Sequence, residues 1–457
     1  MSKRNFILLI IVSTLVATAI LGFLYLRPKT PTPIDDIIDT NFISQFNPFG
    51  NSKPPTKGIE TSPVDVSGYE PNVEEETPKV KLIKISSMPI AGFTVFIKER
   101  LKEIPIVNTT PPLALPLSEE GVPPAKGGAG GLKTTKPTPP LTEFMPALRY
   151  VAKATGNIYQ TFADKIEERK FSTTTIPKVY EAYFGNRGEF VSMRYLKGDE
   201  RTIETFVGAL PKELLGGDMT ENNEIKGSFL PNNVKDISIS PDTSKVFYLW
   251  TSGESMIGTT LNLKNNKKVQ VFDSPFTEWL SQWPTDNIIT LTTKPSVGVP
   301  GYIYTIDGSG KNLTKVLGEI NGLTTLVGPN GKLVLYGNNN LSLNIYHTDT
   351  RNSDLLGVRT LPEKCVWSKI SDAIYCAVPK SINSGDYPDT WYQGEVSFND
   401  QIWKIDAKTG NTTLILDLAT LTKGEEIDSI KLTLDESENY LFFVNKKDSF
   451  LWKLELK

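Results

Sequence analysis

A two-strand unit recurs along most of this chain, and its spacing constrains the fold more than any other feature of the sequence. Each copy is a predicted strand, a tight turn and a second predicted strand. The turns are mostly a little over 40 residues apart. That spacing is typical of β-propeller blades, which repeat about every 40–45 residues. The copies lie at 179–195, 236–250, 277–292, 323–337, 365–378 and 430–444.

A second unit follows most copies of the first. It begins with a strand that carries an aromatic residue at its second or third position, and a polar turn and an outer strand follow. Together the two units predict a four-stranded meander, with strands a to d. Gly, Asn and Asp turns interrupt the chain about every 8–12 residues, so no helical period competes. The second units lie at 157–171, 302–316, 344–358 and 401–415.

A seventh blade is predicted at the start of the array. Residues 89–99 are similar to strand a and 147–156 to strand b, and a Pro/Gly-rich insert at 107–140 separates them. The chain ends at 450–457 on what matches strand c of the last blade, with no strand d after it. Because an open sheet edge promotes aggregation, we expect 79–86 to supply the missing strand. The fold class predicted is therefore an all-β, seven-bladed propeller closed by an N-terminal strand.

Closure assigns the loops to faces. In a meander the a–b and c–d turns share one face, and the b–c and d–a connections share the other. The insert at 107–140 should lie on the face where the chain enters the propeller. The opposite face, called the far face here, should carry the b–c loops at 292–302 and 379–400.

The N-terminal segment reads as a membrane anchor. Residues 6–26 carry no charge, and about 20 apolar residues suffice for a transmembrane helix. A cleaved signal peptide is the alternative, but the apolar run continues beyond the A-x-A motif at 17–19. We expect a cytoplasmic N-terminus (1–5), a single span (6–26), a disordered Pro-rich linker (27–78) and an extracytoplasmic propeller (79–457). Basic residues flank both ends of the span, so charge alone nearly leaves the orientation open.

The two cysteines of the chain bear on location. Cys365 and Cys376 fall on strands a and b of the sixth blade. With Ile370 and Ser371 at the centre of the turn, they face each other directly, within reach of a disulfide. The alternative is two small buried thiols. A disulfide favours an oxidising, extracytoplasmic compartment.

The residue types in the sequence give little support for a catalytic site or a metal site. One histidine and two cysteines are too few for a His/Cys zinc site, and we expect His347 to be a solvated strand residue. No cofactor is predicted. Carboxylates in flexible loops do not form a preorganised pair, although a rigid acidic cluster in the central channel with raised pKa values would favour an enzyme. The loop carboxylates are Glu119, Glu120, Asp386, Asp389 and Glu395, and aspartates assigned to turn chemistry are Asp236, Asp242, Asp349, Asp406 and Asp435.

Recognition is the better-supported activity. One far-face loop holds several aromatic residues spaced by Gly and Asp, and exposed aromatics are favoured interface anchors. The alternative is that these side chains fold back and cover the end of the sixth blade. A net charge of −3 without a basic stripe argues against nucleic acid. The candidate binding residues are Tyr387, Asp389, Trp391, Tyr392 and Phe398.

The pattern ISISPDTSKVFY at 237–248, together with IWKIDAKTGNTT at 402–413, resembles the WD40-like (PD40 or TolB-type) propeller repeats. The order of anchor, linker and propeller is similar to that of uncharacterised envelope propellers of small-genome bacteria. The resemblance implies a non-catalytic binding or scaffold propeller at the cell membrane, with an envelope protein or glycan as partner. An envelope glycan hydrolase or lyase using loop carboxylates is the alternative, and the oligomeric state is left open.

Overall fold

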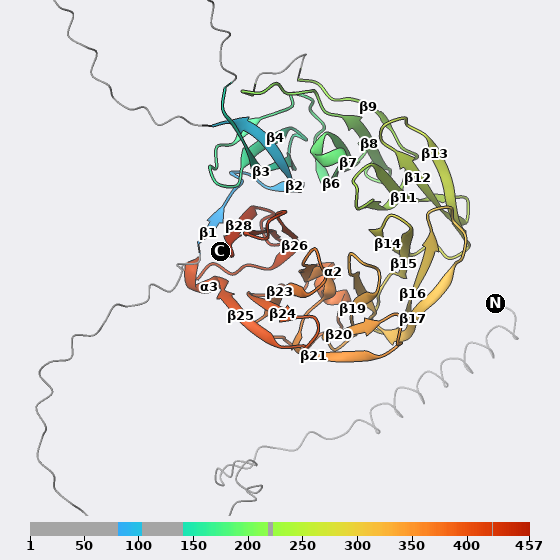
Figure 1. Cartoon of the computed structure of the whole chain (residues 1–457). Helices are drawn as coiled ribbons and strands as arrows, with labels where there is room; N and C mark the ends of the chain where they lie inside the picture. Colours follow the sequence, from blue (N-terminus) through green and yellow to red (C-terminus); the bar gives the residue numbers. More distant parts are fainter. Residues whose placement is uncertain (1–80, 103–139, 218–222, 423) are drawn as a thin grey trace, which may run out of the picture. The chain divides into compact units, whose positions relative to one another are not determined.

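The computed structural model describes residues 81–102, 140–217, 223–422 and 424–457. Within these ranges the strands form seven four-stranded sheets, arranged as blades around a central channel (Figure 1). The prediction of an all-β, seven-bladed propeller is confirmed. The predicted span at 6–26, the linker at 27–78 and most of the insert at 107–140 lie outside the described residues. In the part of the chain that is described, no helix is long and apolar enough to cross a membrane.

The first three blades follow the chain in order, each with its strands a to d side by side. Blade one has the longest hairpin, whose register runs from Ile90 opposite Ala152 to Leu101 opposite Thr142. A short 3-10 helix, η2 (Asn186–Gly188), joins the first two strands of blade two. The strands are β2 (Ile90–Leu101), β3 (Thr142–Ala152), β4 (Ile158–Phe162), β5 (Arg169–Lys170), β6 (Val179–Gly185), β7 (Phe190–Leu196), β8 (Ile203–Ala209), β9 (Lys226–Phe229), β10 (Val234–Ile239), β11 (Lys245–Ser252), β12 (Ser255–Asn262) and β13 (Lys268–Ser274).

Blades four to six repeat the same order. The 3-10 helix η3 (Pro362–Lys364) precedes blade six, α2 (Asp389–Gln393) lies in its b–c loop, and α3 (Leu418–Leu421) follows it. The strands are β14 (Trp279–Thr285), β15 (Ile288–Thr293), β16 (Pro300–Asp307), β17 (Thr314–Asn321), β18 (Thr324–Val327), β19 (Leu333–Gly337), β20 (Ser342–His347), β21 (Ser353–Arg359), β22 (Cys365–Trp367), β23 (Ala373–Pro379), β24 (Asp400–Asp406) and β25 (Thr412–Asp417).

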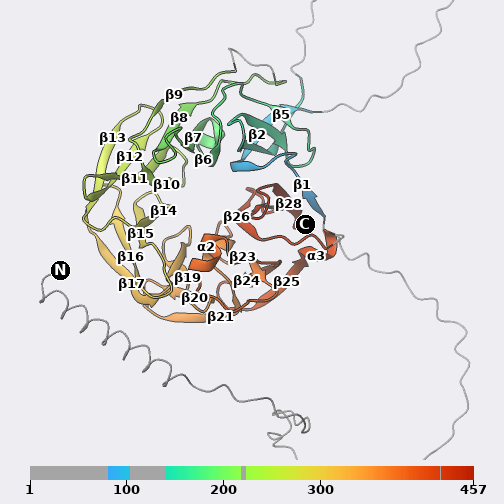
Figure 2. The same cartoon turned by 180° about the vertical axis from the view of Figure 1, so that it is seen from behind.

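The last blade closes the ring because it combines strands from the start and from the end of the described propeller. Its strands a, b and c are β26 (Ser429–Leu434), β27 (Tyr440–Asn445) and β28 (Leu451–Glu455), and its strand d is β1 (Leu82–Lys84). Leu82 lies opposite Leu454 and Lys84 opposite Trp452, antiparallel. The predicted closure is therefore confirmed. Figure 1 shows β1 beside β28 at the C-terminus, and Figure 2 gives the view from behind.

The core lies between neighbouring blades, because each sheet buries both faces against the next. Trp279 and Trp283 of blade four pack with Phe247 and Phe272 of blade three. The alternating apolar residues of the repeats therefore supply the faces that hold adjacent blades together.

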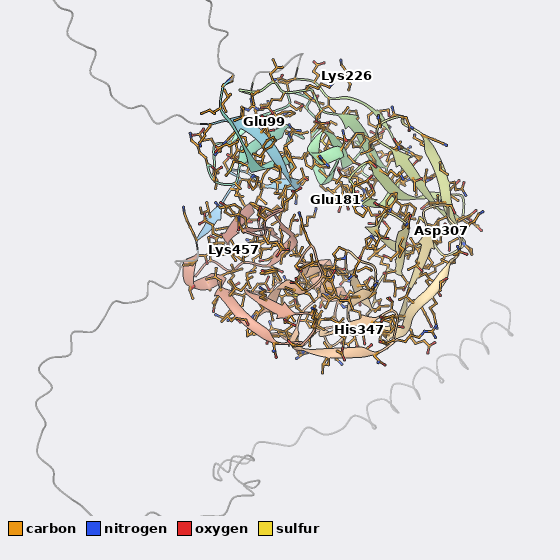
Figure 3. All side chains as sticks on the ribbon, viewed as in Figure 1. Glu99, Glu181, Lys226, Asp307, His347 and Lys457 are labelled. Atoms are coloured by element: carbon orange, nitrogen blue, oxygen red, sulfur yellow. A yellow bond between two sulfur atoms is a disulfide. The ribbon has the colours of Figure 1, made fainter. Side chains whose placement is uncertain are left out.

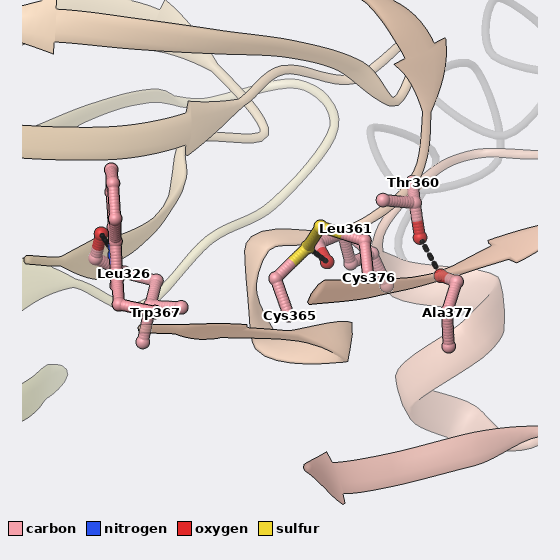
Figure 4. Close-up of a disulfide and its surroundings, with 7 residues drawn as sticks. All are labelled: Leu326, Thr360, Leu361, Cys365, Trp367, Cys376 and Ala377. Carbon is pink, nitrogen blue, oxygen red and sulfur yellow. Dashed lines mark hydrogen bonds between the residues drawn. A yellow bond between two sulfur atoms is a disulfide. The ribbon is translucent and has the colours of Figure 1, made fainter. Parts of the chain in front are cut away.

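The two cysteines form a disulfide within the core between blades five and six. Cys365 of β22 lies directly opposite Cys376 of β23, with Cα atoms 4.1 Å apart. Both side chains are buried, and Trp367 on the same strand donates from Nε1 to the Leu326 carbonyl of blade five, 3.2 Å away (Figure 4). The predicted disulfide and its register are confirmed.

Candidate functional site

The central channel contains a cavity of about 450 Å³, in the range typical of small-ligand sites. Its wall comes from the inner strands of five blades, from η3 and from α2, which lies beside the channel in both views (Figures 1 and 2). Figure 3 shows Glu181, one of its carboxyl groups, at the inner edge of the ring. The lining residues used below are Glu181, Asp236, Ser281, Gln282, Thr292, Thr324, Thr325, Glu363, Trp391, Tyr392 and Lys431.

Bulges in the inner strands turn charged residues towards this cavity. In β6 the register shifts between Val179 and Glu181, and in β10 it shifts at the matching place, between Val234 and Asp236. In β26 a shift surrounds Lys431, whose φ of 55° is left-handed. A bulge adds an unpaired residue and re-aims a side chain, and left-handed backbone at a non-glycine residue is often found at functional sites.

Asp236 is held by blade four. The Ser281 amide and hydroxyl both donate to Asp236 Oδ2, each at 2.6 Å. No described lysine or arginine makes an ion pair with this carboxyl group. Burial raises the pKa of Asp236 to about 6, and the two Ser281 hydrogen bonds only partly oppose that rise.

Glu363 occupies the other side of the cavity, on η3. Its carboxylate accepts a short hydrogen bond from the Tyr392 hydroxyl. Burial raises the pKa of Glu363 to about 7, while Tyr392 and the neighbouring Lys364 charge work in the opposite direction. Two carboxyl groups of the same cavity therefore change protonation near neutral pH.

The cations at the cavity already have partners. Glu181 accepts from Arg194 Nη1, and Arg194 Nη2 donates to the Val234 carbonyl at 2.6 Å. Lys431 Nζ donates to the Ala91 carbonyl of blade one at 3.1 Å. Burial lowers the pKa of Lys431, although the Glu181 charge raises it.

Neutral polar groups line the rest of the wall. Gln282 Nε2 donates to the Thr325 carbonyl at 2.6 Å, and the Thr292 and Thr325 hydroxyls lie 2.7 Å apart. Thr324 is 2% exposed, and its hydroxyl has no hydrogen-bond partner among the described residues. A buried hydroxyl without a partner carries a desolvation penalty.

An ion cluster formed by Lys364, Asp400 and Asp428 supports the Glu363 side of the cavity. All three side chains are fully buried. Lys364 Nζ donates to Asp400 Oδ2 at 2.8 Å and makes a shorter bond to Asp428. Asp428 Oδ2 in turn accepts from Trp391 Nε1 at 2.9 Å. The ion cluster therefore fixes η3, which carries Glu363, and α2, which carries Trp391 and Tyr392.

The pKa values of the two acids in the ion cluster shift in opposite directions. Burial raises the pKa of Asp400 to about 6, and Lys364 only partly opposes it. Burial also acts to raise the pKa of Asp428, but Lys364 and the hydrogen bonds from Phe398 and Trp391 hold it below its usual value.

The predicted binding residues differ in their exposure to solvent, and three of them are buried. Tyr387, Trp391 and Phe398 are 2–4% exposed and form a small core with Leu341 and Leu361. The far-face loop (380–399) thus folds back over the end of blade six, as the alternative interpretation holds. Trp391 nevertheless lines the cavity.

Tyr392 and Asp389 have different surroundings. Tyr392 is 40% exposed and stands at the cavity wall. Asp389 Oδ2 accepts from the Val297 amide at 2.6 Å, which joins the two long far-face loops. Asp386 and Glu395 are exposed and do not line the cavity. Glu119 and Glu120 lie outside the described residues.

Asp236 was assigned to turn chemistry from the sequence, and that assignment is wrong. It lies within β10, whereas Asp242, Asp406 and Asp435 do accept from turn amides, those of Ser244, Lys408 and Tyr440 respectively. A usable signal was present, because VYE (179–181) and VKD (234–236) place an acid at the same position of the inner strand in successive repeats. His347 pairs with Asp354 at 2.9 Å, on β20 and away from the cavity.

Comparison with known proteins adds no argument about the fold or the function of this chain. No family model matches this chain, and no curated protein matches it. Among solved structures, it is similar to an oligogalacturonate lyase from Vibrio parahaemolyticus at 7% identity and a TM-score of 0.47, over 68% of this chain and 86% of that one. At that level the likeness does not extend to function, which is inferred below from the cavity alone.

Proposed function

We propose that this chain is a membrane-anchored binding propeller of the cell envelope, and that it takes part of a glycan into the channel cavity. The anchor is the predicted helix at 6–26, and the propeller is proposed to stand outside the cytoplasm. The confirmed disulfide is consistent with that location, because disulfides persist in oxidising compartments.

The cavity carries the proposal. Its wall combines an exposed ring, that of Tyr392, with carboxyl, amide and hydroxyl groups. Sugars present an apolar ring face and many hydroxyls, so a wall of this composition offers both a stacking surface and hydrogen-bond partners. About 450 Å³ is room for one or two sugar units and too little for a folded protein.

The test is binding of soluble di- and trisaccharides to the full-length chain in detergent, measured by calorimetry. Replacing Tyr392 with Ala should weaken binding about tenfold, since an anchor of this kind is typically worth more than 1 kcal/mol. Phe144→Ala is the matched control, because Phe144 is 67% exposed on β3, outside the cavity. The proposal fails if no sugar binds, or if both variants weaken binding equally.

A second candidate, an envelope glycan hydrolase or lyase, is favoured by one observation. Asp236 and Glu363 line the same cavity with pKa values of about 6 and about 7. General acid–base catalysis works best with groups that titrate near the operating pH. In this enzyme hypothesis the acting carboxyl groups lie on β10 and η3. The sequence-based alternative had instead assigned them to the loops.

Mass spectrometry of sugars incubated with the chain separates the two candidates. A hydrolase adds water across the glycosidic bond, whereas a lyase leaves a double bond in the product. Glu363→Gln should abolish product formation while sugars still bind. Binding without any product from the wild-type chain would leave the binding function and remove the catalytic one.

A further inference from the structure

We infer that the cavity selects sugars carrying a primary ammonium group, with free amino sugars as the ligand class. The inference deepens the proposed function and depends on it. It rests on which charges meet in the cavity, which of them already have partners, and which polar groups are left for a ligand.

The charge count of the wall is negative. The lining includes three carboxyl groups, those of Glu181, Asp236 and Glu363, and one lysine, Lys431. Arg194 pairs with Glu181 from behind the wall. If all of these groups are ionised, the wall has an excess of acid, which attracts a cationic ligand and repels an anionic one.

Two of the three acids lack a cation. Asp236 is held only by the Ser281 amide and hydroxyl, and Glu363 by the Tyr392 hydroxyl. The described residues place no lysine or arginine within ion-pair distance of either carboxylate. An enclosed carboxylate without a counter-charge is costly, so an ammonium group placed beside either carboxyl group would relieve that cost.

Lys431 does not fill this role. Its Nζ is directed to the Ala91 carbonyl of blade one, 3.1 Å away, and its electrostatic neighbours are Glu181, Lys153 and Arg194. The bulge in β26 fixes that direction. A ligand ammonium near Asp236 and Glu363 would therefore supply a charge that the chain itself does not.

The remaining groups favour a sugar over a simple amine. Thr292 and Thr325 are buried and their hydroxyls pair with each other, so the wall offers a ligand mainly its carboxyl groups and Tyr392. The carboxyl groups can accept hydrogen bonds from sugar hydroxyls, while the exposed Tyr392 offers a ring face. A ligand with both an ammonium group and several hydroxyls matches the whole wall.

The pH dependence follows from the groups facing the two acids. Burial raises the pKa of both, to about 6 for Asp236 and about 7 for Glu363. Ammonium binding should therefore strengthen from pH 5 towards pH 7 as the carboxyl groups lose protons, and weaken again above the pH at which the sugar amine, which itself titrates near neutral pH, loses its charge. The charged or titratable neighbours are Glu181, Arg194 and Tyr183 around Asp236, and Lys364, Tyr392 and Asp389 around Glu363 and its partner.

Calorimetry on the full-length chain in detergent tests this with four disaccharides: a glucosamine dimer, its N-acetylated form, neutral cellobiose and anionic digalacturonate. At pH 7 the glucosamine dimer should bind at least about tenfold more tightly than the N-acetylated form, a difference of about 1.4 kcal/mol. The preference should shrink at pH 5. It should disappear in an Asp236→Asn, Glu363→Gln double variant that still binds the N-acetylated dimer.

Glu395→Gln is the matched control, because Glu395 is an exposed carboxyl on the far-face loop that does not line the cavity. Equal binding of the glucosamine and N-acetylated dimers, or tighter binding of digalacturonate, overturns the amino-sugar inference and leaves glycan binding intact. Failure of all four sugars overturns glycan binding as well. If the double variant does not fold, the comparison of pH 5 with pH 7 on the wild-type chain decides the question.

Discussion

The seam of the ring and the support of the cavity are built differently. At the seam, β1 lies along β28, the Ile85 amide donates to the Leu451 carbonyl at 2.7 Å, and apolar side chains pack on both sides. Beneath the cavity, three fully buried charged residues form the ion cluster and hold η3 and α2 in place. One region depends on backbone pairing and apolar burial, the other on a few side-chain contacts.

The difference predicts how each region responds to change. Backbone pairing tolerates many side chains, because the hydrogen bonds do not depend on their identity. A buried ion cluster tolerates few, since removal of one partner leaves an uncompensated charge. Sequence variation should therefore be easier at the seam than at Lys364, Asp400 and Asp428.

The largest effect is expected for Lys364→Met. This change leaves Asp400 and Asp428 facing each other without a cation, and breaking a buried pair typically costs about 3–5 kcal/mol. Chemical denaturation of the variant should show that loss. Lys369→Met is the control, because Lys369 is exposed on the same blade, and it should change the free energy of unfolding by less than about 0.5 kcal/mol.

A triple variant sharpens this test. Lys364→Met combined with Asp400→Asn and Asp428→Asn removes all three charges, so much of the lost stability should return. Stability that stays as low in the triple variant as in Lys364→Met would mean that packing, and not charge, holds this region.

The next effect is expected at the seam, for Ile83→Pro. Ile85 and Lys81 take part in hydrogen bonds to β28, so by alternation the Ile83 amide faces β28 and the Lys84 amide faces solvent. Proline at 83 removes a ladder bond and leaves the facing carbonyl unpaired, which should cost about 1–3 kcal/mol. Proline at 84 should cost clearly less, as measured by urea unfolding, and equal costs would contradict the described register.

A smaller effect is expected for the disulfide. The bond joins residues 11 apart, so it closes a short loop, and its contribution should be about 2–3 kcal/mol or less. Reduction should lower the thermal midpoint while the far-face loop keeps its place, since the ion cluster does not include the cysteines. Loss of sugar binding on reduction would show that the hairpin positions the cavity.

The last effect is the pH dependence of stability. The pKa of Glu363 is higher in the folded chain, about 7, than its ordinary value of 4.5. Its stabilising contribution is therefore fully present below pH 4.5 and is lost as pH rises through 7. Glu363→Gln should gain stability relative to wild type between pH 5 and pH 8, whereas Ile83→Pro should keep a constant difference. A flat difference for Glu363→Gln would contradict the raised pKa.

Repetition explains why so much of the fold could be predicted from the sequence. The blade period, the match of 79–86 to the fourth strand of the last blade and the register of Cys365 with Cys376 depend on local patterns and on counting. The same frame placed the loops at 292–302 and 379–400 on one face, and the structure brings them into contact, since the Val297 amide donates to Asp389 Oδ2.

The cavity could be predicted only in part. Trp391 and Tyr392 were among the predicted residues, but the sequence did not reveal that Trp391, Tyr387 and Phe398 would be buried. Glu363 was missed because it lies on η3, between blades and outside the repeating strands, and Asp236 was missed for a different physical reason. Whether an acid in an inner strand faces the channel or a neighbouring blade depends on a bulge, and a one-residue shift reverses the direction of the side chain.

The pairing of β1 with β28 has a consequence for biosynthesis. The two strands lie at opposite ends of the described propeller, so β1 is synthesised first and must wait for β28 before it finds its partner. Such distant pairing is slow to form. Until β28 has been synthesised, the nascent ring stays open with a bare sheet edge, and a stop before Leu451 would leave that edge uncovered.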